Sequence, residues 1–258
     1  MGRVICVANQ KGGVGKTTTA VNLASCLALS EKRTLLVDID PQANASSGLG
    51  VRLSRGEPSI YDLLISDKAG DRTIRKTQLE YLHILPSSRD LYGAEVELVS
   101  VGSRERLLSE VLSLLKGRYD YILVDCPPSL GFLTLNALVA SDTTLIPIQC
   151  EYYALEGVGN LLSTIRRVQA SMNPQLKIEG FLLTMFDPRN NLSHQVVEDV
   201  RKHFANQVFK TIIPRNVKLS ESPSFGKPVI LYDITSRGAV SYLSLCKEMI
   251  DAEPHRNA

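Results

Sequence analysis

Residues 4–19 read Val4-Ile-Cys-Val-Ala8-Asn-Gln-Lys11-Gly-Gly-Val-Gly-Lys16-Thr-Thr-Thr19, an apolar run followed by a glycine-rich segment and three threonines. The apolar run has the composition of a buried parallel strand. The glycines carry no Cβ, so the backbone can curl and direct several N–H groups toward one anion. A helix beginning near Lys16 would add the favourable field of its N-terminus. The segment therefore predicts a strand, a phosphate-binding loop and a helix.

The end of this loop predicts a nucleoside triphosphate with Mg²⁺ as the ligand. Lys16 is placed to contact the β- and γ-phosphates, and the hydroxyl of Thr17 is placed to ligate Mg²⁺. The expected nucleotide contacts are Gly12, Gly13, Val14, Gly15, Lys16, Thr17 and Thr18.

The first lysine of the loop, Lys11, needs a different explanation. The usual phosphate-binding motif has a glycine five residues before Gly15, but this chain has Gln10 there, followed by Lys11. One lysine is enough to serve the phosphates within one chain. Lys11 is therefore either a solvated surface lysine or the first lysine of the deviant Walker A motif, K-G-G-x-G-K-T-T, which reaches across a dimer interface to the partner's nucleotide.

The composition is that of an ordinary globular chain. Its 258 residues are 44% hydrophobic and 22% charged, and the net charge of +2 does not indicate a nucleic-acid binder at the level of the whole protein. The five cysteines form no C-x-x-C pair, so we expect buried free thiols in a reducing compartment. With no signal peptide and no apolar run of about 18 residues, the sequence predicts a soluble cytoplasmic protein.

Further apolar runs predict strands that alternate with helices along the chain. The expected strands are 4–8, 34–38, 82–86, 119–124, 143–148, 178–184 and 210–213. Because these runs are almost entirely apolar, they indicate a sheet that is buried on both faces. The predicted fold is one α/β domain over residues 1–258, a mostly parallel twisted sheet with helices on both faces, of the P-loop NTPase type. Functional residues should then follow the carboxyl ends of the strands.

Three aspartates stand at such strand ends. Asp125 is expected to hold Mg²⁺ through water. Asp38 is expected to support the Mg²⁺ shell, whereas Asp40, further along the same loop, is expected to orient the attacking water. The alternative for Asp38 and Asp40 is an Asx turn before Pro41. The predicted catalytic residues are Lys11, Lys16 and Asp40.

Several segments together resemble one protein family. They are Lys11-Gly-Gly-Val-Gly-Lys-Thr-Thr18, Asp38-Ile-Asp-Pro-Gln42, Asp125-Cys-Pro-Pro-Ser129, Gln149-Cys-Glu-Tyr-Tyr-Ala-Leu-Glu-Gly157, and Pro214-Arg-Asn216 with Leu219-Ser-Glu-Ser-Pro-Ser224. With them, the sequence from Val4 to about Lys247 is similar to the ParA/Soj family of chromosome-partitioning ATPases. The first segment is typical of the wider deviant Walker A superfamily, and the segments 149–157 and 219–224 are more specific.

The resemblance implies a molecular switch that uses ATP and Mg²⁺. ATP binding brings two subunits face to face, so that Lys11 contacts the partner's phosphates and Gly12 must stay small where the backbones approach. The ATP-bound homodimer binds double-stranded DNA without sequence preference. A ParB-type centromere-binding protein stimulates hydrolysis, and DNA is released. The protein is then expected in the cytoplasm, associated with the nucleoid and not with a membrane.

The resemblance also implies residues for DNA and for adenine. Basic residues that match Arg189 and Lys218 contact DNA in the family, and residues 207–228 include four basic side chains against one acid. Contacts of such side chains with phosphates give binding without sequence preference. The adenine base is expected beside Met185, Pro214, Arg215 and Asn216. For each of these residues, the alternative is an ordinary surface charge, turn or core contact.

Three other functions are compatible with parts of the sequence. A membrane-cycling division regulator of the MinD type needs a basic amphipathic C-terminal helix, but residues 250–258 contain acids, a proline and no apolar stripe. An iron–sulfur carrier needs suitably spaced cysteines, which Cys126 lacks. A sequence-specific repressor needs a helix-turn-helix segment, for which we expect no room before the first strand. The sequence therefore favours the partitioning ATPase.

Overall fold

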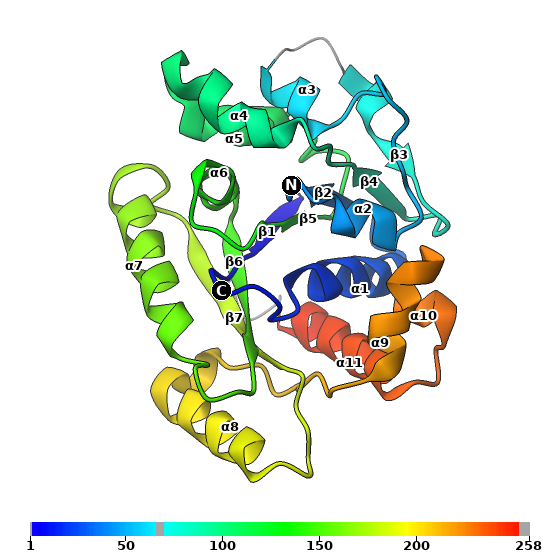
Figure 1. Cartoon of the computed structure of the whole chain (residues 1–258), viewed down its shortest axis with the longest axis vertical. Coiled ribbons are helices and arrows are strands. Elements are labelled where there is room, and N and C mark those ends of the chain that lie inside the picture. The colour runs from blue at the N-terminus through cyan, green and yellow to red at the C-terminus, as the bar shows by residue number, and fades with distance from the viewer. Residues whose placement is uncertain (1, 66–69, 253–258) are drawn as a thin grey trace.

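The computed structural model describes residues 2–65 and 70–252, and a seven-stranded sheet forms their centre (Figure 1). The strand order is β3-β4-β2-β5-β1-β6-β7. The strands are β1 Arg3–Val7, β2 Thr34–Asp38, β3 Arg75–Lys76, β4 Leu82–Leu85, β5 Tyr121–Asp125, β6 Thr143–Gln149 and β7 Lys177–Thr184. Neighbouring strands are parallel, except that β3 runs antiparallel to β4. The predicted mostly parallel sheet is confirmed.

Helices cover both faces of this sheet (Figure 1). They are α1 Lys16–Leu29, α2 Asn44–Gly48, α3 Ile60–Ile65, α4 Leu91–Glu97, α5 Leu107–Ser113, α6 Phe132–Ala140, α7 Glu156–Ser171, α8 Asn191–Phe204, α9 Val217–Glu221, α10 Val229–Tyr232 and α11 Arg237–Asp251. Short 3₁₀ turns connect several of them. The described chain thus alternates between strand and helix, as the sequence predicts.

The alternation of side chains along β1 explains why two cores form. Val4 and Cys6 point into a core with residues of α5, α6 and α7, whereas Ile5 and Val7 point into a second core with residues of α1 and α11. Successive side chains of a strand face opposite sides of a sheet. A strand that is apolar at every position can therefore be covered only by helices on both faces.

The predicted strand 210–213 is wrong. Only isolated bridges join this region to β7: the Phe209 N–H donates to the Phe181 carbonyl at 3.0 Å, and the Ile213 N–H donates to the Leu183 carbonyl at 2.9 Å. The intervening N–H groups of residues 210 and 211 donate instead to the carboxylate of Glu248, at 2.7 and 3.0 Å. This side chain removes the donors that a continuous strand would need.

The alternative of a membrane-cycling regulator of the MinD type depends on the C-terminal end of the chain. Residues 253–258, which form most of the tail considered for an amphipathic helix, lie outside the described residues. Within residues 2–65 and 70–252, no helix is both long and apolar enough to cross a membrane.

Candidate functional site

The glycine-rich loop joins the end of β1 to the beginning of α1. Gly13 and Gly15 have φ angles of +74° and +88°, which L side chains adopt only with strain. Between them, the backbone carbonyl of Val14 accepts a hydrogen bond of 2.9 Å from the Thr184 hydroxyl at the end of β7. The curled loop, which follows β1, is therefore fixed to the end of β7, two strands away in the sheet. Thr17 and Thr18 lie in the first turn of α1.

Gly12 differs from these two glycines. A Cβ added there would meet only one atom, the Cβ of Pro128 at 3.9 Å, which is ordinary van der Waals contact. Gly12 is exposed and its φ is outside the left-handed range. Nothing among the described residues therefore requires glycine at this position.

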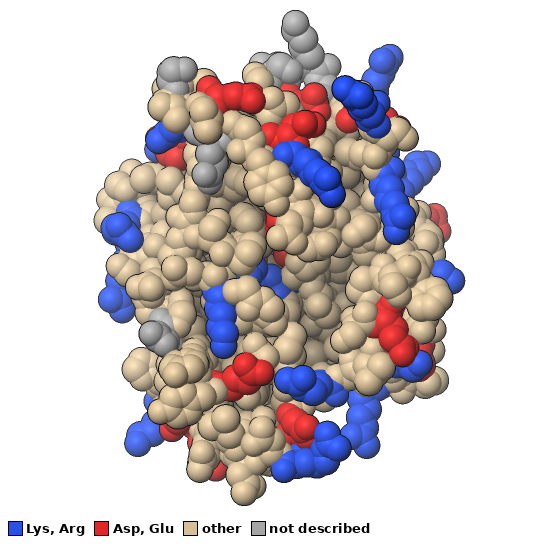
Figure 2. Space-filling view, viewed as in Figure 1, with Lys and Arg blue, Asp and Glu red and all other residues tan. Residues whose placement is uncertain are grey.

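Lys16 lies inside the loop. Its side chain is largely buried, and its Nζ donates to the backbone carbonyl of Lys11 at 3.0 Å. Burial lowers the pKa of Lys16, and the negative charge of Asp125 opposes this shift. The ammonium is thus held between the curled backbone and the carboxylate at the end of β5, where a phosphate would need a cation. Figure 2 shows basic side chains in a recess near the middle of this face of the molecule.

Asp38 and Asp125 are direct neighbours in the sheet, since they are register partners at the carboxyl ends of β2 and β5. Both side chains are fully buried. Burial and the charge of Asp38 raise the pKa of Asp125, while Thr17 and Lys16 act in the opposite direction. Neither carboxylate oxygen of Asp125 has a hydrogen-bond partner among the described residues. Two unpartnered buried oxygens beside a threonine hydroxyl suit a hydrated divalent cation.

Asp38 has protein partners instead. Its Oδ2 accepts hydrogen bonds from the backbone N–H and the hydroxyl of Ser46, at 2.8 and 2.7 Å, and its Oδ1 accepts from the Asp40 N–H at 3.2 Å. Burial raises the pKa of Asp38 to about 6 despite these bonds. Asp38 therefore fixes α2 against the end of β2. Of the two candidate metal ligands, Asp125 is the one whose carboxylate oxygens make no hydrogen bond among the described residues.

Asp40 forms the Asx turn that was considered as the alternative to its catalytic role. Its Oδ1 accepts a hydrogen bond of 2.9 Å from the Gln42 N–H, which is the Asx turn considered as the alternative. Its backbone carbonyl accepts from the Ser87 hydroxyl at 2.6 Å. These bonds fix the loop, while Oδ2 makes no hydrogen bond to a described residue. The Asx turn therefore holds one carboxylate oxygen of Asp40 and leaves the other available.

Lys11 points away from the interior of the loop. Its Nζ lies 3.9 Å from Oε2 of Glu151, just after β6. The other oxygen of Glu151 lies 3.6 Å from Nη2 of Arg215 and accepts from Gln149 Nε2 at 2.5 Å. Glu151 thus joins the loop lysine to the turn that the sequence assigned to adenine. The sequence did not predict a role for Glu151. The one feature that could have indicated it is an acidic residue just after a strand, at the same edge of the sheet as the loop.

The residues assigned to adenine lie together. Met185, with a φ of +53°, directly follows β7. The next residue, Phe186, bridges to Pro214, and its carbonyl accepts from the Arg215 N–H at 2.9 Å. The side chain of Asn216 caps α9 by accepting from the Leu219 N–H. Since Thr184 also holds the loop, the two halves of the predicted nucleotide site meet at the end of β7.

The two basic residues assigned to DNA are both exposed and both paired locally. The Arg189 side chain is 87% exposed and binds Asp187 through Nε and Nη2, at 3.0 and 2.9 Å, which lowers the pKa of Asp187 to about 2. Lys218 binds Glu221 at 3.0 Å and lies over the ring of Tyr232. Neither pairing hides the cation from solvent.

Comparison with known proteins shows which family the chain resembles. A family model described as an AAA domain matches residues 2–178. Chromosome partitioning protein ParA of Myxococcus xanthus is 58% identical over 250 residues, which are 97% of this chain and 88% of that protein. Sporulation initiation inhibitor protein Soj of Bacillus subtilis is 57% identical over 249 residues, which are 96% of this chain and 98% of that protein.

A solved structure shares the fold. Cobyrinic acid a,c-diamide synthase from Mycobacterium smegmatis, with bound ADP and magnesium, superposes with a TM-score of 0.86 at 36% identity, covering 98% of this chain and 96% of that one. The partitioning proteins are much more similar in sequence and match nearly end to end. The chain belongs to the ParA/Soj family of chromosome-partitioning ATPases.

Proposed function

We propose that this chain is an Mg²⁺-dependent ATPase that dimerises when it binds ATP, and that the dimer binds double-stranded DNA without sequence preference. A ParB-type centromere-binding protein stimulates hydrolysis and ends this state. The observation that carries the proposal is the different placement of two lysines in one loop. Lys16 enters the loop, whereas Lys11 points out of it toward Glu151.

The residues around the loop fit ATP and Mg²⁺. The backbone between Gly12 and Thr18 and the ammonium of Lys16 would hold the phosphates, while Thr17 and Asp125 would hold the cation, directly or through water. Mg²⁺, when bound, would neutralise charge on the phosphates. Asp38 would act at one remove, since its carboxylate already binds Ser46. Relatives of the fold bind such ligands, as in the structure with ADP and magnesium.

Asp40 is the residue that we assign to the attacking water. Phosphoryl transfer requires a correctly positioned nucleophile more than a strong base. One Asp40 oxygen is held by the Asx turn, so the position of the other is fixed before any ligand binds. A preorganised acceptor of this kind orients water without reorganising during the reaction.

Two features of the loop support a dimer through the nucleotide face. Lys11 is not used by the phosphate cradle of its own chain, and it is 35% exposed. Gly12 has room for a side chain within its own chain, so the close neighbour that would require glycine must come from outside. A partner backbone approaching Gly12, with its phosphates beside Lys11, would explain both.

DNA binding would use Arg189 and Lys218. Exposed ion pairs contribute little, so exchanging Asp187 or Glu221 for a DNA phosphate costs little free energy. Two subunits bring two copies of each cation to one duplex, which raises avidity and steepens the salt dependence. This explains how a chain with a net charge of +2 would bind DNA only as a dimer. The dimer would then act in the cytoplasm, on the nucleoid.

Steady-state ATP hydrolysis tests the proposal directly. The rate would be measured with ATP alone, with double-stranded DNA, with a ParB-type protein, and with both. We expect slow basal hydrolysis and the highest rate with both partners present. A rate that neither partner changes would contradict the proposed cycle, although it would leave the ATPase assignment intact.

A further inference from the structure

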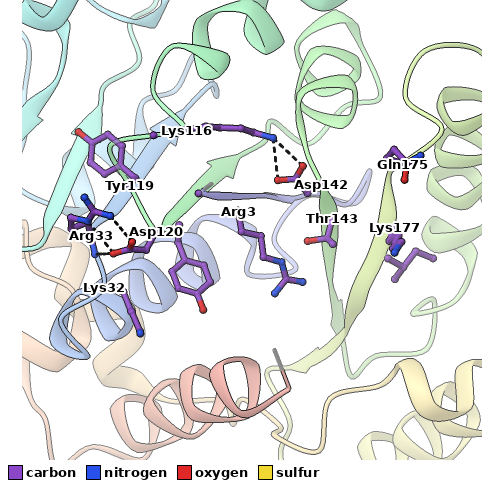
Figure 3. Close-up of a pocket in the computed structure, with 14 residues that line it drawn as sticks. Arg3, Lys32, Arg33, Lys116, Tyr119, Asp120, Asp142, Thr143, Gln175 and Lys177 are labelled. Carbon is purple, nitrogen blue, oxygen red and sulfur yellow. Dashed lines mark hydrogen bonds and ion pairs between the residues drawn. The ribbon is translucent and has the colours of Figure 1, made fainter. Parts of the chain in front are cut away.

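A second hollow lies at the opposite edge of the sheet, where the parallel strands begin. It has a volume of about 950 Å³ and is called the basal hollow here (Figure 3). Its lining residues are Gly2, Arg3, Lys32, Arg33, Lys116, Gly117, Tyr119, Asp120, Tyr121, Asp142, Thr143, Gln175, Lys177 and Ile178. Pockets that hold small molecules have volumes in this range. The proposed ATPase cycle assigns no role to any of these residues.

Three polar side chains line up across neighbouring strands in the basal hollow. Thr143 on β6 is the register partner of Lys177 on β7 and of Ile5 on β1. Register partners project to the same face, and so does Arg3, which stands two residues before Ile5. Neighbouring strands are about 4.8 Å apart. A hydroxyl is thereby placed between a guanidinium and an ammonium, as Figure 3 shows.

The charge of the basal hollow is positive. Five basic residues line it, against two acids, Asp120 and Asp142. Both acids are already neutralised. Asp120 binds Arg33 at 2.8 Å, and Asp142 binds Lys116 at 3.0 Å and also accepts from a backbone N–H at 2.8 Å.

The remaining cations are Arg3, Lys32 and Lys177. Arg3 binds the buried carboxylate of Glu179. Lys32 and Lys177 have no ion-pair partner anywhere in residues 2–65 and 70–252. A guanidinium has five N–H donors, so Arg3 can contact more than one group at a time. Of the cations in the basal hollow, Lys32 and Lys177 are therefore the two that lack a direct ion pair within the described chain.

Thr143 gives an independent indication of a ligand. Its side chain is only 7% exposed, and its hydroxyl has no hydrogen-bond partner among the described residues. A buried polar group without a partner is unfavourable, and native proteins leave few of them. The hydroxyl can donate to an anion, and the cations on either side would neutralise that anion.

We propose that the basal hollow binds a small phosphorylated anion, with one phosphate between Arg3, Thr143 and Lys177. A phosphate accepts several hydrogen bonds at once and matches both the planar fork of arginine and the point charge of lysine. A phosphate of duplex DNA has the same chemistry but lies on a convex surface, whereas Thr143 is recessed. The site is independent of the proposed ATPase cycle, because it uses the other edge of the sheet.

Calorimetric titration with inorganic pyrophosphate tests this site in the full chain. The protein is first saturated with Mg²⁺ and a non-hydrolysable ATP analogue, so that the P-loop cannot take up the probe. We expect one pyrophosphate per chain. Lys177→Glu and the near-isosteric Thr143→Val should each weaken binding by at least about tenfold, since each removes a charge-assisted hydrogen bond. Lys202→Glu, an exposed charge reversal on α8, is the matched control and should bind as the unmodified chain does.

Three results would overturn the site. The first is no binding at about 10 mM pyrophosphate, a concentration at which even a site with a Kd of about 1 mM would be mostly occupied. The second is an unchanged affinity of Lys177→Glu for pyrophosphate. A thermal transition that matches that of the control would show that this variant is folded. The third is retention of a short DNA duplex that depends on Lys177 while pyrophosphate does not bind. That third result would assign the basal hollow to DNA phosphates instead of a small molecule.

Discussion

The Nζ atom of Lys11 lies 3.9 Å from Oε2 of Glu151, so the lysine that we assign to a partner's nucleotide is paired within its own chain. The two side chains are 35% and 48% exposed. Exposed pairs of this kind contribute at most about 1 kcal/mol. Lys11 can therefore leave Glu151 at small cost when a triphosphate comes near.

Replacing Glu151 with glutamine should favour the dimer slightly. Glu151→Gln removes the charge that competes for Lys11, so the ATP concentration at half-dimerisation should fall by no more than about fivefold. Sedimentation velocity at several ATP concentrations measures this shift. A large rise in the required concentration would contradict this explanation and would show that Glu151 itself contacts the partner or its nucleotide.

Replacing Lys11 with alanine should separate nucleotide binding from dimerisation. In Lys11→Ala, Lys16 still serves the phosphates, so binding of a fluorescent ATP analogue should stay within about threefold of the unmodified chain, as for an exposed side chain. The ATP-induced dimer should be absent in size-exclusion chromatography. Lys247→Ala, an exposed lysine on α11, is the control. A normal ATP dimer of Lys11→Ala would refute its role across the interface.

Replacing Asp40 with alanine should trap the ATP-bound state. Without an acceptor to orient water, hydrolysis should fall by about 100-fold or more. Mg²⁺ and phosphate contacts remain, so the variant should accumulate as an ATP dimer. Single-turnover hydrolysis and chromatography on the same sample check both statements. Fast hydrolysis by this variant would assign the water to another residue.

Reversing the charge of Arg189 should abolish DNA retention and spare hydrolysis. Arg189→Glu replaces two cations per dimer with two anions, so the DNA phosphates lose two favourable contacts and meet two like charges instead. Gel shifts with an unrelated duplex, with ATP present, measure retention. Lys76→Glu on β3, at the other end of the sheet, should shift DNA normally. An unchanged gel shift for Arg189→Glu would exclude it from the DNA surface.

Removing the Ser46 hydroxyl should destabilise the fold near the site. Ser46→Ala deprives the buried Asp38 carboxylate of a hydrogen bond of 2.7 Å, which should lower the free energy of unfolding by about 1–3 kcal/mol. Urea unfolding measures this as a lower midpoint. The neighbouring Ser47→Ala removes an exposed bond to Asn44 and should change stability by less than about 0.5 kcal/mol. Equal midpoints for the two variants would show that Asp38 does not depend on Ser46.

The sequence predicted the inner strands well because they are continuous apolar runs. β2 has the predicted bounds, 34–38, and every residue in it is buried. The prediction failed at 210–213, where the apolar pattern continues but Glu248, far away in the sequence, binds the backbone donors. The sequence patterns also predicted no helix at α2, α4, α6, α9 or α10. Of these, α2 and α9 are one or two turns of small or mixed residues, which have no clear period.

The candidate site was predicted as a set of residues but not as a set of contacts. Strand ends indicated Asp38, Asp40 and Asp125, and the structure brings these loops to one edge. That Asp38 is held by Ser46 depends on a turn of α2, and that Lys11 meets Glu151 depends on the neighbouring strand β6. Such pairings between loops follow from the order of strands in the sheet, which local sequence patterns do not encode.

The hydroxyl of Thr184 donates a hydrogen bond to the carbonyl of Val14 in the glycine-rich loop. Thr184 is also the residue directly before Met185. The phosphate end and the base end of the proposed nucleotide site are thereby both attached to the end of β7. The distance between the phosphate-binding loop and the turn at 214–216 is therefore set by the sheet and not by either loop. If the proposed nucleotide site is correct, a ligand of the wrong length must deform the turn at 214–216, and nucleotide selectivity can be changed at that turn without disturbing the phosphate-binding loop.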